Sequence, residues 1–306
     1  MPASTSLFRA YGLLTFTALC WGGNAVFGQL AVDQVSPFFL VTLRWTGALI
    51  LLVSIGLRQT RADWPILKKH LLFLCAMGVL GFTLFNALFY VASHSTTALN
   101  VGIIQGAMPM FVLVGAFLAY GTRITFIQIC GVLIGLLGVV AVVSRGNWDT
   151  LVNLSVNVGD GMMVFACLLY AGYAVGLRRV PAVSSLSVFT VMAAAALVFS
   201  LGLTGIEYVS GNLQWPTTKG WIVVGLITLF PSFFAQLFFM QGVSIIGPGR
   251  AGVFVNLVPV FAAGLAVLLL GERFELYHGV ALLLVLAGIG ASEIGKPGAK
   301  EPLQKP

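Results

Sequence analysis

Apolar residues fill this chain in long uninterrupted stretches. Residues 10–32 contain no charged side chain, and residues 34–57 contain only Arg44. The 52 residues of segment 71–122 also lack Lys, Arg, Asp and Glu, so this segment holds two membrane spans of about 20 residues each, separated at the polar stretch 93–97. The remaining uncharged stretches are 124–144, 161–177, 180–206, 220–249, 251–271 and 276–292. This pattern predicts an all-α membrane protein with ten transmembrane helices.

The composition agrees with this prediction. Of the 306 residues, 59% are hydrophobic and 8% are charged, with a mean hydropathy of +1.02. Ordinary soluble domains have about a quarter charged residues. These values exclude a soluble enzyme, a disordered chain and a disulfide scaffold. The four cysteines lie in apolar stretches without a CxxC spacing, and we interpret them as small buried hydrophobic residues.

The basic residues predict the orientation in the membrane. With a cytoplasmic N-terminus, 12 basic residues fall inside and three fall outside, which favours cytoplasmic N- and C-termini. The net charge of +7 is therefore mainly an orientation signal. The inside residues are Arg9, Arg58, Arg61, Lys68, Lys69, Arg123, Arg178, Arg179, Arg250, Lys296, Lys300 and Lys305, and the outside ones are Arg145, Lys219 and Arg273.

A weak internal repeat divides the chain into two halves. At an offset of 150 residues Pro109 meets Pro259, Gly121 meets Gly271 and Gly138 meets Gly288, among other matches. Five helices per half is an odd number, so the second half enters the membrane from the opposite side. Inverted repeats of this kind are typical of alternating-access transporters, whose site lies near the midplane. The predicted organisation is a first repeat at 8–144, a connector at 145–157, a second repeat at 158–294 and a cytoplasmic tail at 295–306.

Polar and aromatic residues inside the predicted spans are candidates for a substrate site. Polar groups in lipid normally face the protein interior or a water-filled cavity. Several recur at helical spacing or at equivalent positions of the two halves. The candidates are Trp21, Asn24, Asn86, Tyr90, His94, Gln105, Tyr170, Tyr173, Gln236 and Asn256. Interhelical hydrogen bonding and ordinary aromatic packing explain the same residues equally well, and Tyr90 and His94 also fit an outer aromatic belt.

Two further features concern the interior of the membrane. Arg44 is the one formal charge well inside a predicted span, and it fits either a substrate carboxylate or a structural role through helix-end carbonyls. Pro109 and Pro259 fall mid-helix in the fourth and ninth spans. Because proline removes one helical hydrogen bond, the pair is typical of either gating hinges or static kinks.

Motifs that the chain lacks also narrow its function. No Asp or Glu lies deep in a predicted span, which favours an uncoupled facilitator over a proton antiporter. No GxxxxGK[ST] loop and no pairing of a nucleophile with a base are found, so we predict neither an ATP-driven pump nor an enzyme. We expect no cofactor, no metal and no nucleic-acid partner. The expected partners are a small-molecule substrate and the lipid bilayer, and both a monomer and a homodimer are compatible with the sequence.

Several motifs resemble those of the drug/metabolite transporter superfamily with its paired EamA-type domains. Segment 18–27, with the sequence ALCWGGNAVF, is similar to the first-helix motif of that family. Segment 36–45 is similar to the start of its second helix, with Arg44 at the family's helix-2 arginine. Segments 259–261 and 270–272 are similar to its ninth helix.

Within the superfamily, the chain is most similar to bacterial exporters of aromatic and other amino acids. The resemblance implies export of amino acids or related small metabolites across the bacterial inner membrane by alternating access. Two alternatives are a proton-coupled drug or metabolite efflux pump and a membrane scaffold or sensor that transports nothing. The absence of an acid in the first helix speaks against proton-coupled efflux of drug cations.

Overall fold

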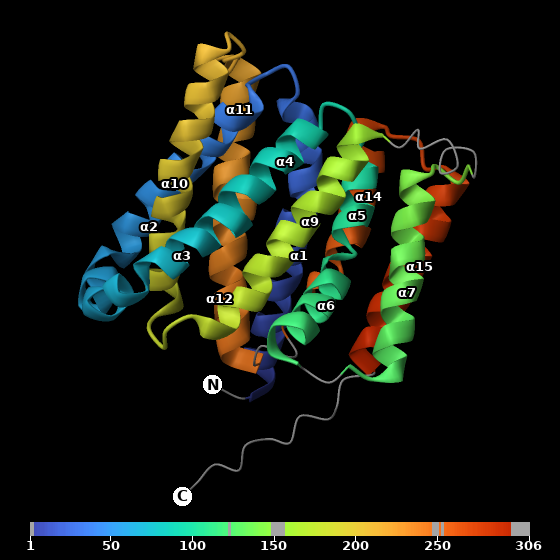
Figure 1. Ribbon diagram of the computed structural model, residues 1–306, viewed down its shortest axis with the longest axis horizontal. Coiled ribbons are helices and arrows are strands. Elements are labelled where there is room, and N and C mark those ends of the chain that lie inside the picture. Colours follow the sequence, from blue (N-terminus) through green and yellow to red (C-terminus); the bar gives the residue numbers. More distant parts are fainter. Residues whose placement is uncertain (1–2, 122–123, 148–156, 247–250, 252–253, 295–306) are drawn as a thin grey trace, which may run out of the picture.

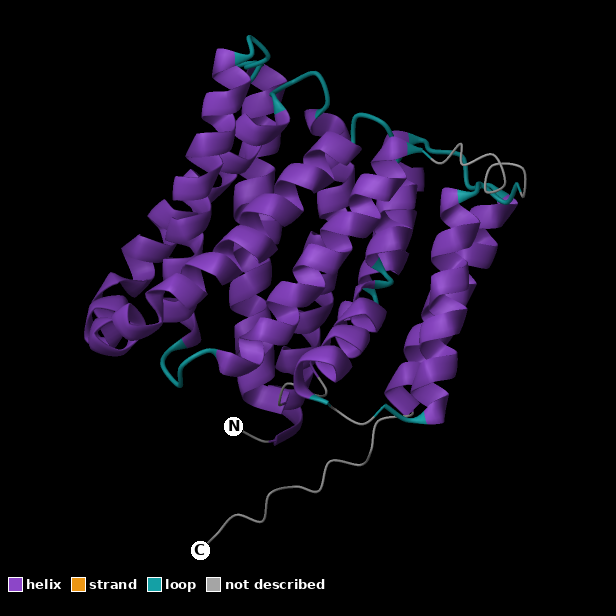
Figure 2. Cartoon of the chain, viewed as in Figure 1, coloured by secondary structure: helices purple, strands orange, loops and turns teal. Residues whose placement is uncertain are grey.

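The computed structural model describes residues 3–121, 124–147, 157–246, 251 and 254–294. Within these residues all regular secondary structure is helical, and the loops lie mainly at the two ends of the bundle (Figure 2). The predicted tail at 295–306 and residues 148–156 of the predicted connector lie outside the described residues. The prediction of an all-α protein is therefore confirmed for the described part of the chain.

The helices lie side by side in the bundle, and several of them are interrupted by 3-10 or π-helical segments or by short turns. The first half contains α1 (Ala3–Ala31), α2 (Pro37–Leu67), η1 (Lys68–His70), α3 (Leu71–Gly78), η2 (Val79–Leu84), α4 (Phe85–Ala92), α5 (Ala98–Gln105), α6 (Met108–Tyr120) and α7 (Phe126–Val143). The second half contains α9 (Val158–Gly176), η3 (Leu177–Arg179), α10 (Ser185–Val209), α11 (Thr218–Ile227), η4 (Thr228–Phe234), α12 (Ala235–Ile246), α14 (Val258–Leu270) and α15 (Leu276–Ile294).

The helices have the length and composition of membrane spans. Six helical runs of the described residues are long and apolar enough to cross a membrane, and two shorter helices are also apolar. The six are Pro37–Ala92, Ala98–Tyr120, Phe126–Val143, Val158–Arg179, Ser185–Val209 and Thr218–Val243, and the two are Val258–Leu270 and Leu276–Ser292. The chain is a helical membrane protein, while the number of ten spans stays a prediction.

Helix ends recur at equivalent places in the two halves. Gly121 ends α6 and Gly271 ends α14, and both have a left-handed backbone with φ of +61° and +66°. Glycine adopts this conformation without the steric penalty of a Cβ atom. Two π-helical segments, η2 and η4, interrupt α3–α4 and α11–α12. The same kinds of irregularity therefore occur in both halves of the chain.

The two repeat-related prolines start helices. Pro109 lies in the first turn of α6 and Pro259 in the first turn of α14, each after a short turn. The first turn of a helix has backbone N–H groups without intrahelical partners, so the missing N–H of proline is tolerated there. The prediction that both prolines lie mid-helix is therefore wrong, because each proline follows a break between two helices. The alternatives of a gating hinge and a static kink at each break both stay predictions.

Helices of the two halves are interleaved in the bundle. The first helix of the chain, α1, packs against α12 and α14, while α9 packs against α4 and α6. We call these sets the α1 group (α1, α12, α14) and the α9 group (α4, α6, α9). The pair α2 and α10 lies on one lateral side of the bundle, and the pair α7 and α15 lies on the opposite side (Figure 1). Each of these four sets contains helices from both sequence repeats.

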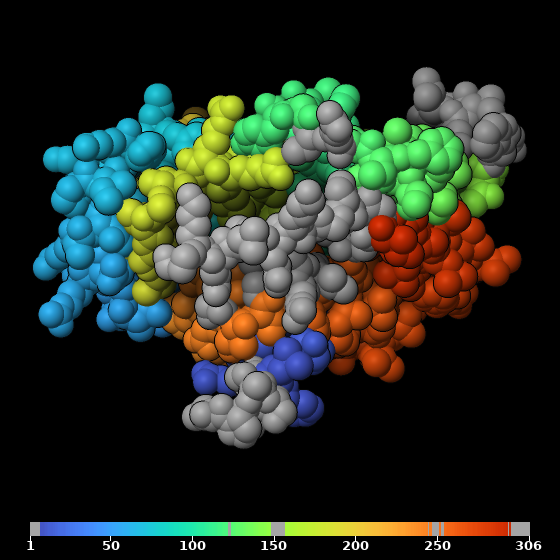
Figure 3. Space-filling view, turned by 90° about the horizontal axis from the view of Figure 1, so that it is seen from below, coloured from blue at the N-terminus to red at the C-terminus, as the bar shows by residue number. Residues whose placement is uncertain are grey.

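The beginning of α1 and the end of α15 lie at the same end of the bundle (Figure 1). Seen toward this end, the turn from α2 into α3 forms one edge of the face, and the start of α7 and the end of α15 lie toward the opposite edge (Figure 3). This order shows that the central α1 and α9 groups are flanked on both sides by a helix pair.

Candidate functional site

The guanidinium of Arg44 lies at the centre of a buried polar cluster. Arg44 is 6% exposed, and its Nη1 donates hydrogen bonds of 2.7 Å to Asn86 Oδ1 and 2.6 Å to Tyr90 Oη. A longer bond of 3.4 Å reaches Asn24 Oδ1. The hydroxyl of Tyr90 also donates to Asn24 Oδ1 at 3.2 Å. Four residues chosen from the sequence thus meet at one point, although they come from α1, α2 and α4.

The cluster holds a cation with neutral partners. The three hydrogen bonds of Arg44 to described residues all leave Nη1, and its Nε is buried without an acceptor among the described residues. In the same part of the chain, the side chain forms no ion pair with a carboxylate. Burying an ion costs several kcal/mol even after relaxation. Neutral acceptors offset a part of this cost, and the rest makes Arg44 a strong attractor for an anion.

Aromatic rings form a continuous group beside the Arg44 cluster. Trp45 stacks on Phe82 with 4.6 Å between ring centroids, and Phe82 lies 5.3 Å from Tyr173. Tyr173 lies 5.2 Å from Tyr170, which lies 5.1 Å from Phe85. The group is joined to the cluster through α4, because Asn86 Nδ2 donates to the carbonyl of Phe82. The rings therefore form one continuous aromatic group, contributed by α2, η2, α4 and α9.

Trp21 lies apart from this cluster. Its Nε1 donates a 3.2 Å hydrogen bond to the carbonyl of Pro231 in η4, and its ring lies 5.4 Å from Phe239. A π-helical segment leaves carbonyl groups that the α-helical pattern would satisfy, and such segments often occur at functional sites. Trp21 of α1 therefore contacts η4 and α12 in the second half of the chain. Asn24, three residues further along α1, instead faces Arg44.

The remaining candidates are dispersed. Gln105 ends α5, and its Oε1 is buried without a partner in the described region. Gln236 in α12 and Asn256 in the turn before α14 are half-buried. His94 is exposed beyond the end of α4. None of these four joins the hydrogen-bonded cluster of Arg44, so the structure gathers part of the predicted set and leaves the rest along the helices.

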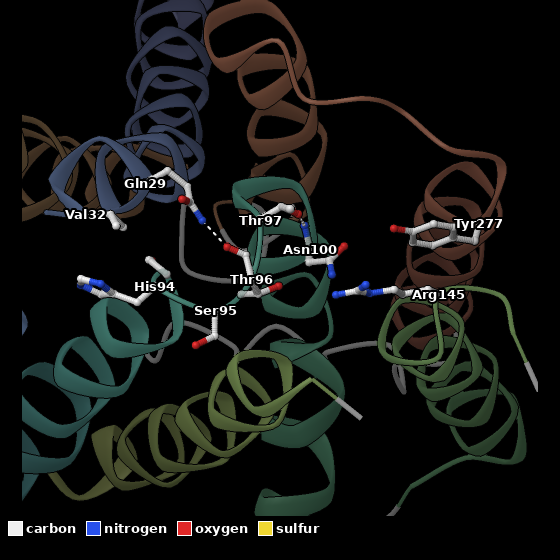
Figure 4. A pocket seen from close by; sticks show the side chains of 10 residues that line it. Gln29, Val32, His94, Ser95, Thr96, Thr97, Asn100, Arg145 and Tyr277 are labelled. Atoms are coloured by element: carbon white, nitrogen blue, oxygen red, sulfur yellow. Dashed lines mark hydrogen bonds between the residues drawn. The ribbon is translucent and has the colours of Figure 1, made fainter. Parts of the chain in front are cut away.

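A polar pocket opens at the turn between α4 and α5 (Figure 4). Its volume is about 430 Å³, within the usual range of small-molecule sites. We call it the α4–α5 pocket. Its lining consists of Gln29, Val32, Ser93, His94, Ser95, Thr96, Thr97, Asn100, Arg145 and Tyr277. The pocket lies at the end of the bundle opposite to the start of α1, and His94 is the one predicted site residue in its lining.

A buried carboxylate is hydrogen-bonded to two residues that line this pocket. Asp160 in the first turn of α9 is fully buried and accepts hydrogen bonds from Thr96 Oγ1 and from Asn100 Nδ2 at 3.2 Å. Asn100 Oδ1 is in turn 3.1 Å from His278 Nε2 of α15. Asp160 lies near the start of its helix and not deep within a span. Its complete burial depends on partners 60 and 64 residues earlier in the chain.

The described residues contain no group of three His, Cys, Asp or Glu side chains that could hold a metal ion. The cysteines are free, and Cys20 and Cys167 are buried. The chemistry that these residues offer is hydrogen bonding, one buried positive charge and aromatic contact. That set is suited to binding a small organic solute in the interior of the bundle.

Comparison with known proteins agrees with the helical fold. The sequence profile of the EamA-like transporter family matches residues 8–144 and 157–292, and the chain belongs to this family. The uncharacterized transporter YyaM of Bacillus subtilis is 26% identical, with 83% of each chain covered. The uncharacterized inner membrane transporter YedA of Escherichia coli is 23% identical, with 95% of this chain and 92% of the relative covered.

A solved structure shares the architecture. A protein of known crystal structure superimposes with a TM-score of 0.62, covering 94% of this chain and 96% of its own, at 19% sequence identity. At this identity the likeness shows the fold alone. An uncharacterized transporter of Archaeoglobus fulgidus is 25% identical over 92% of this chain and 96% of its own.

Proposed function

We propose that this protein exports amino acids, aromatic ones among them, or related small metabolites across the bacterial inner membrane by alternating access. The observation that carries the proposal is the interleaving of helices from both halves around the Arg44 cluster. Asn24 belongs to the α1 group, while Asn86 and Tyr90 belong to the α9 group. A solute between the two groups can be exposed to one side of the membrane and then to the other as they tilt.

The proposed topology has ten spans with both termini in the cytoplasm. The excess of basic residues on one side supports it. With this orientation the α4–α5 pocket is an outer vestibule, and the turn from α2 into α3 lies on the cytoplasmic side. The predicted repeats at 8–144 and 158–294 then correspond by an inverted two-fold relation. The moving bodies in this mechanism are the α1 and α9 groups, each of which mixes helices of both repeats.

The lining of the interior supports the proposed substrate class. Tyr170, Tyr173 and Phe85 offer ring faces and edges to an aromatic or aliphatic side chain, while Asn24 and Asn86 offer amide groups. One buried cation is too little charge for a phosphorylated substrate, which needs several. We assign the outlying residues Trp21, Gln105, Gln236, Asn256 and His94 to the path of the solute on either side of the cluster.

Transport is proposed to run down the substrate gradient. The fully buried acid Asp160, in the first turn of α9, is bound by Thr96 and Asn100 and not by the Arg44 cluster. The proton-coupled alternative predicts accumulation of substrate against its gradient when only a pH gradient is imposed. The scaffold alternative predicts no flux of any solute.

Proteoliposomes containing the full chain test the proposal. We expect exchange of radiolabelled L-phenylalanine and of other amino acids, with no lasting accumulation under a pH gradient. Absence of flux for every amino acid from folded protein would contradict the export proposal, and sustained pH-driven accumulation would contradict the uncoupled mechanism. Arg58→Gln, at an exposed residue of α2 outside the interior, serves as the control variant that retains flux.

The topology has a separate test. Single cysteines introduced at Lys69 and Lys219 in a background without the native cysteines are treated with a membrane-impermeant thiol reagent in intact cells. Labelling at position 219 and protection at position 69 are the expected result. The reverse pattern would overturn the proposed orientation.

A further inference from the structure

We propose that Arg44 binds the carboxylate of the transported solute through the edge formed by its Nε and Nη2 atoms. The inference rests on the proposed function for the access of solutes to the interior, and it narrows the substrate class to carboxylates. It starts from the uneven distribution of hydrogen bonds over the nitrogen atoms of the guanidinium. Nη1 donates to Asn24, Asn86 and Tyr90, whereas Nε is buried without an acceptor in the described part of the chain.

The free edge has the geometry that carboxylates prefer. A guanidinium binds a carboxylate most strongly through two parallel N–H···O hydrogen bonds, and the Nε and Nη2 hydrogens point in the same direction. The hydrogen bonds of Arg44 to its partners among the described residues all leave Nη1, so they do not use the Nε and Nη2 donors. These bonds hold the plane of the guanidinium from its Nη1 side. The side chain is thus pre-oriented for a planar anion.

Charge balance points to the same ligand. The four acids with buried or capping roles serve helix starts elsewhere: Asp63 binds Ser187, Glu207 binds Ser36, Asp160 binds Thr96 and Glu272 binds the amide of Ala98. In the described part of the chain, Arg44 therefore has no protein counter-ion. A buried cation with neutral partners attracts an anion more strongly than a neutral isostere of the same size.

A solute bound to Arg44 would also affect the contacts between the α1 and α9 groups. The cluster ties Asn24 of the α1 group to Tyr90 of the α9 group, through Arg44 at 3.4 Å and 2.6 Å and through a direct bond of 3.2 Å. A carboxylate bound to the Nε and Nη2 atoms changes the electrostatic force on the guanidinium. The guanidinium makes the contacts to Asn24 and Tyr90. Solute binding and the separation of the two groups are thereby linked at one side chain.

The test uses two probes of equal size that differ in charge, 3-phenylpropionate and 3-phenylpropionamide. Their affinities are measured by calorimetry on the purified full chain. We expect the wild type to bind the carboxylate at least about tenfold more tightly than the amide, the equivalent of about 1.4 kcal/mol. Arg44→Gln abolishes this preference, Arg44→Lys keeps a part of it, and the control Arg58→Gln keeps all of it.

Asn86→Asp provides a second test if Arg44→Gln does not fold. A carboxylate at position 86 faces Nη1 at the 2.7 Å position of the present amide oxygen and neutralises the guanidinium internally. We expect it to weaken binding of the carboxylate probe about tenfold with little change for the amide. Equal affinities of the two probes in the wild type, an unchanged preference in Arg44→Gln, or no binding of the carboxylate up to millimolar concentration overturns the proposal.

The flux assay separates this inference from the proposed function. Transport of L-phenylalaninamide as fast as that of L-phenylalanine, in both wild type and Arg44→Gln, would refute the role of Arg44 and leave the export function intact. Carboxylate binding that depends on Arg44 without any flux would refute the export function and leave the binding site intact.

Discussion

The carboxylate of Glu207, in the last turn of α10, accepts a 2.7 Å hydrogen bond from the hydroxyl of Ser36 at the start of α2. It also accepts bonds of 2.8 Å and 2.9 Å from two backbone amides in the first turn of α2. At the opposite end of this antiparallel pair, Asp63 of α2 accepts a 2.6 Å bond from Ser187 in the first turn of α10. Each helix thus caps the start of the other, which joins α2 and α10 into one unit.

Replacing Glu207 by Gln is expected to destabilise the protein. The amide keeps the size of the side chain but turns one acceptor into a donor that faces donors of α2. Buried hydrogen-bonding groups left without partners cost about 1–3 kcal/mol each, so the apparent melting temperature should fall clearly. Thermal denaturation in detergent measures the effect. Asp33→Asn, the same chemical change at an exposed turn residue, should leave the melting temperature unchanged; equal melting of the two variants would contradict the capping role.

The hydroxyl of Tyr90 offers a test of the interior cluster. Tyr90→Phe keeps the buried ring but removes the 2.6 Å contact to Arg44 and the bond to Asn24. A hydrogen bond to a charged group contributes about 1.5–3 kcal/mol, so we expect amino-acid flux to fall by about tenfold or more. Initial rates in proteoliposomes check this expectation. Tyr208→Phe, at a residue that is 72% exposed, is the matched control, and a normal rate in Tyr90→Phe would argue against the cluster's part in transport.

The contact of α7 with α15 depends on glycine. A Cβ atom at Gly288 would lie 2.5 Å from the carbonyl oxygen of Gly131, well inside van der Waals contact. Gly288→Ala should therefore force these helices apart, with a loss of about 1–3 kcal/mol. Gly290→Ala, two residues further along, meets no atom within 4 Å and should be neutral. Thermal denaturation of both variants distinguishes close packing from a general effect of glycine on helix propensity.

Pro109 offers a test of movement at the break between α5 and α6. Pro109→Ala restores a backbone N–H that can bond to the carbonyl of Gln105 and so favours one continuous helix. We expect the variant to fold normally but to turn over several-fold more slowly, at unchanged KM, if the break must flex during transport. The matched control is Pro65→Ala, at an exposed residue near the end of α2. Unchanged turnover in Pro109→Ala would identify the break as static.

Much of the fold could be predicted from local features of the sequence. Uncharged stretches of about 20 residues predict helices because backbone polar groups in lipid must be satisfied within the segment. The sequence pairs Gly121 with Gly271 at an offset of 150 residues, and in the structure each of them ends a helix. The π-helical segments were not foreseen, because one extra residue in a turn leaves no signature in a uniformly apolar stretch.

The candidate site could likewise be predicted from the sequence only in part. The sequence shows that Arg44 is a rare charge in an apolar span and that Asn86 and Tyr90 share a helix face. The packing of the helices brings Asn24 to this group, directs Trp21 to the carbonyl of Pro231, and encloses Asp160 between Thr96 and Asn100. The physical reason is that apolar helix surfaces resemble one another. Their partners and rotations are set by close packing and by hydrogen bonds between segments far apart in the chain.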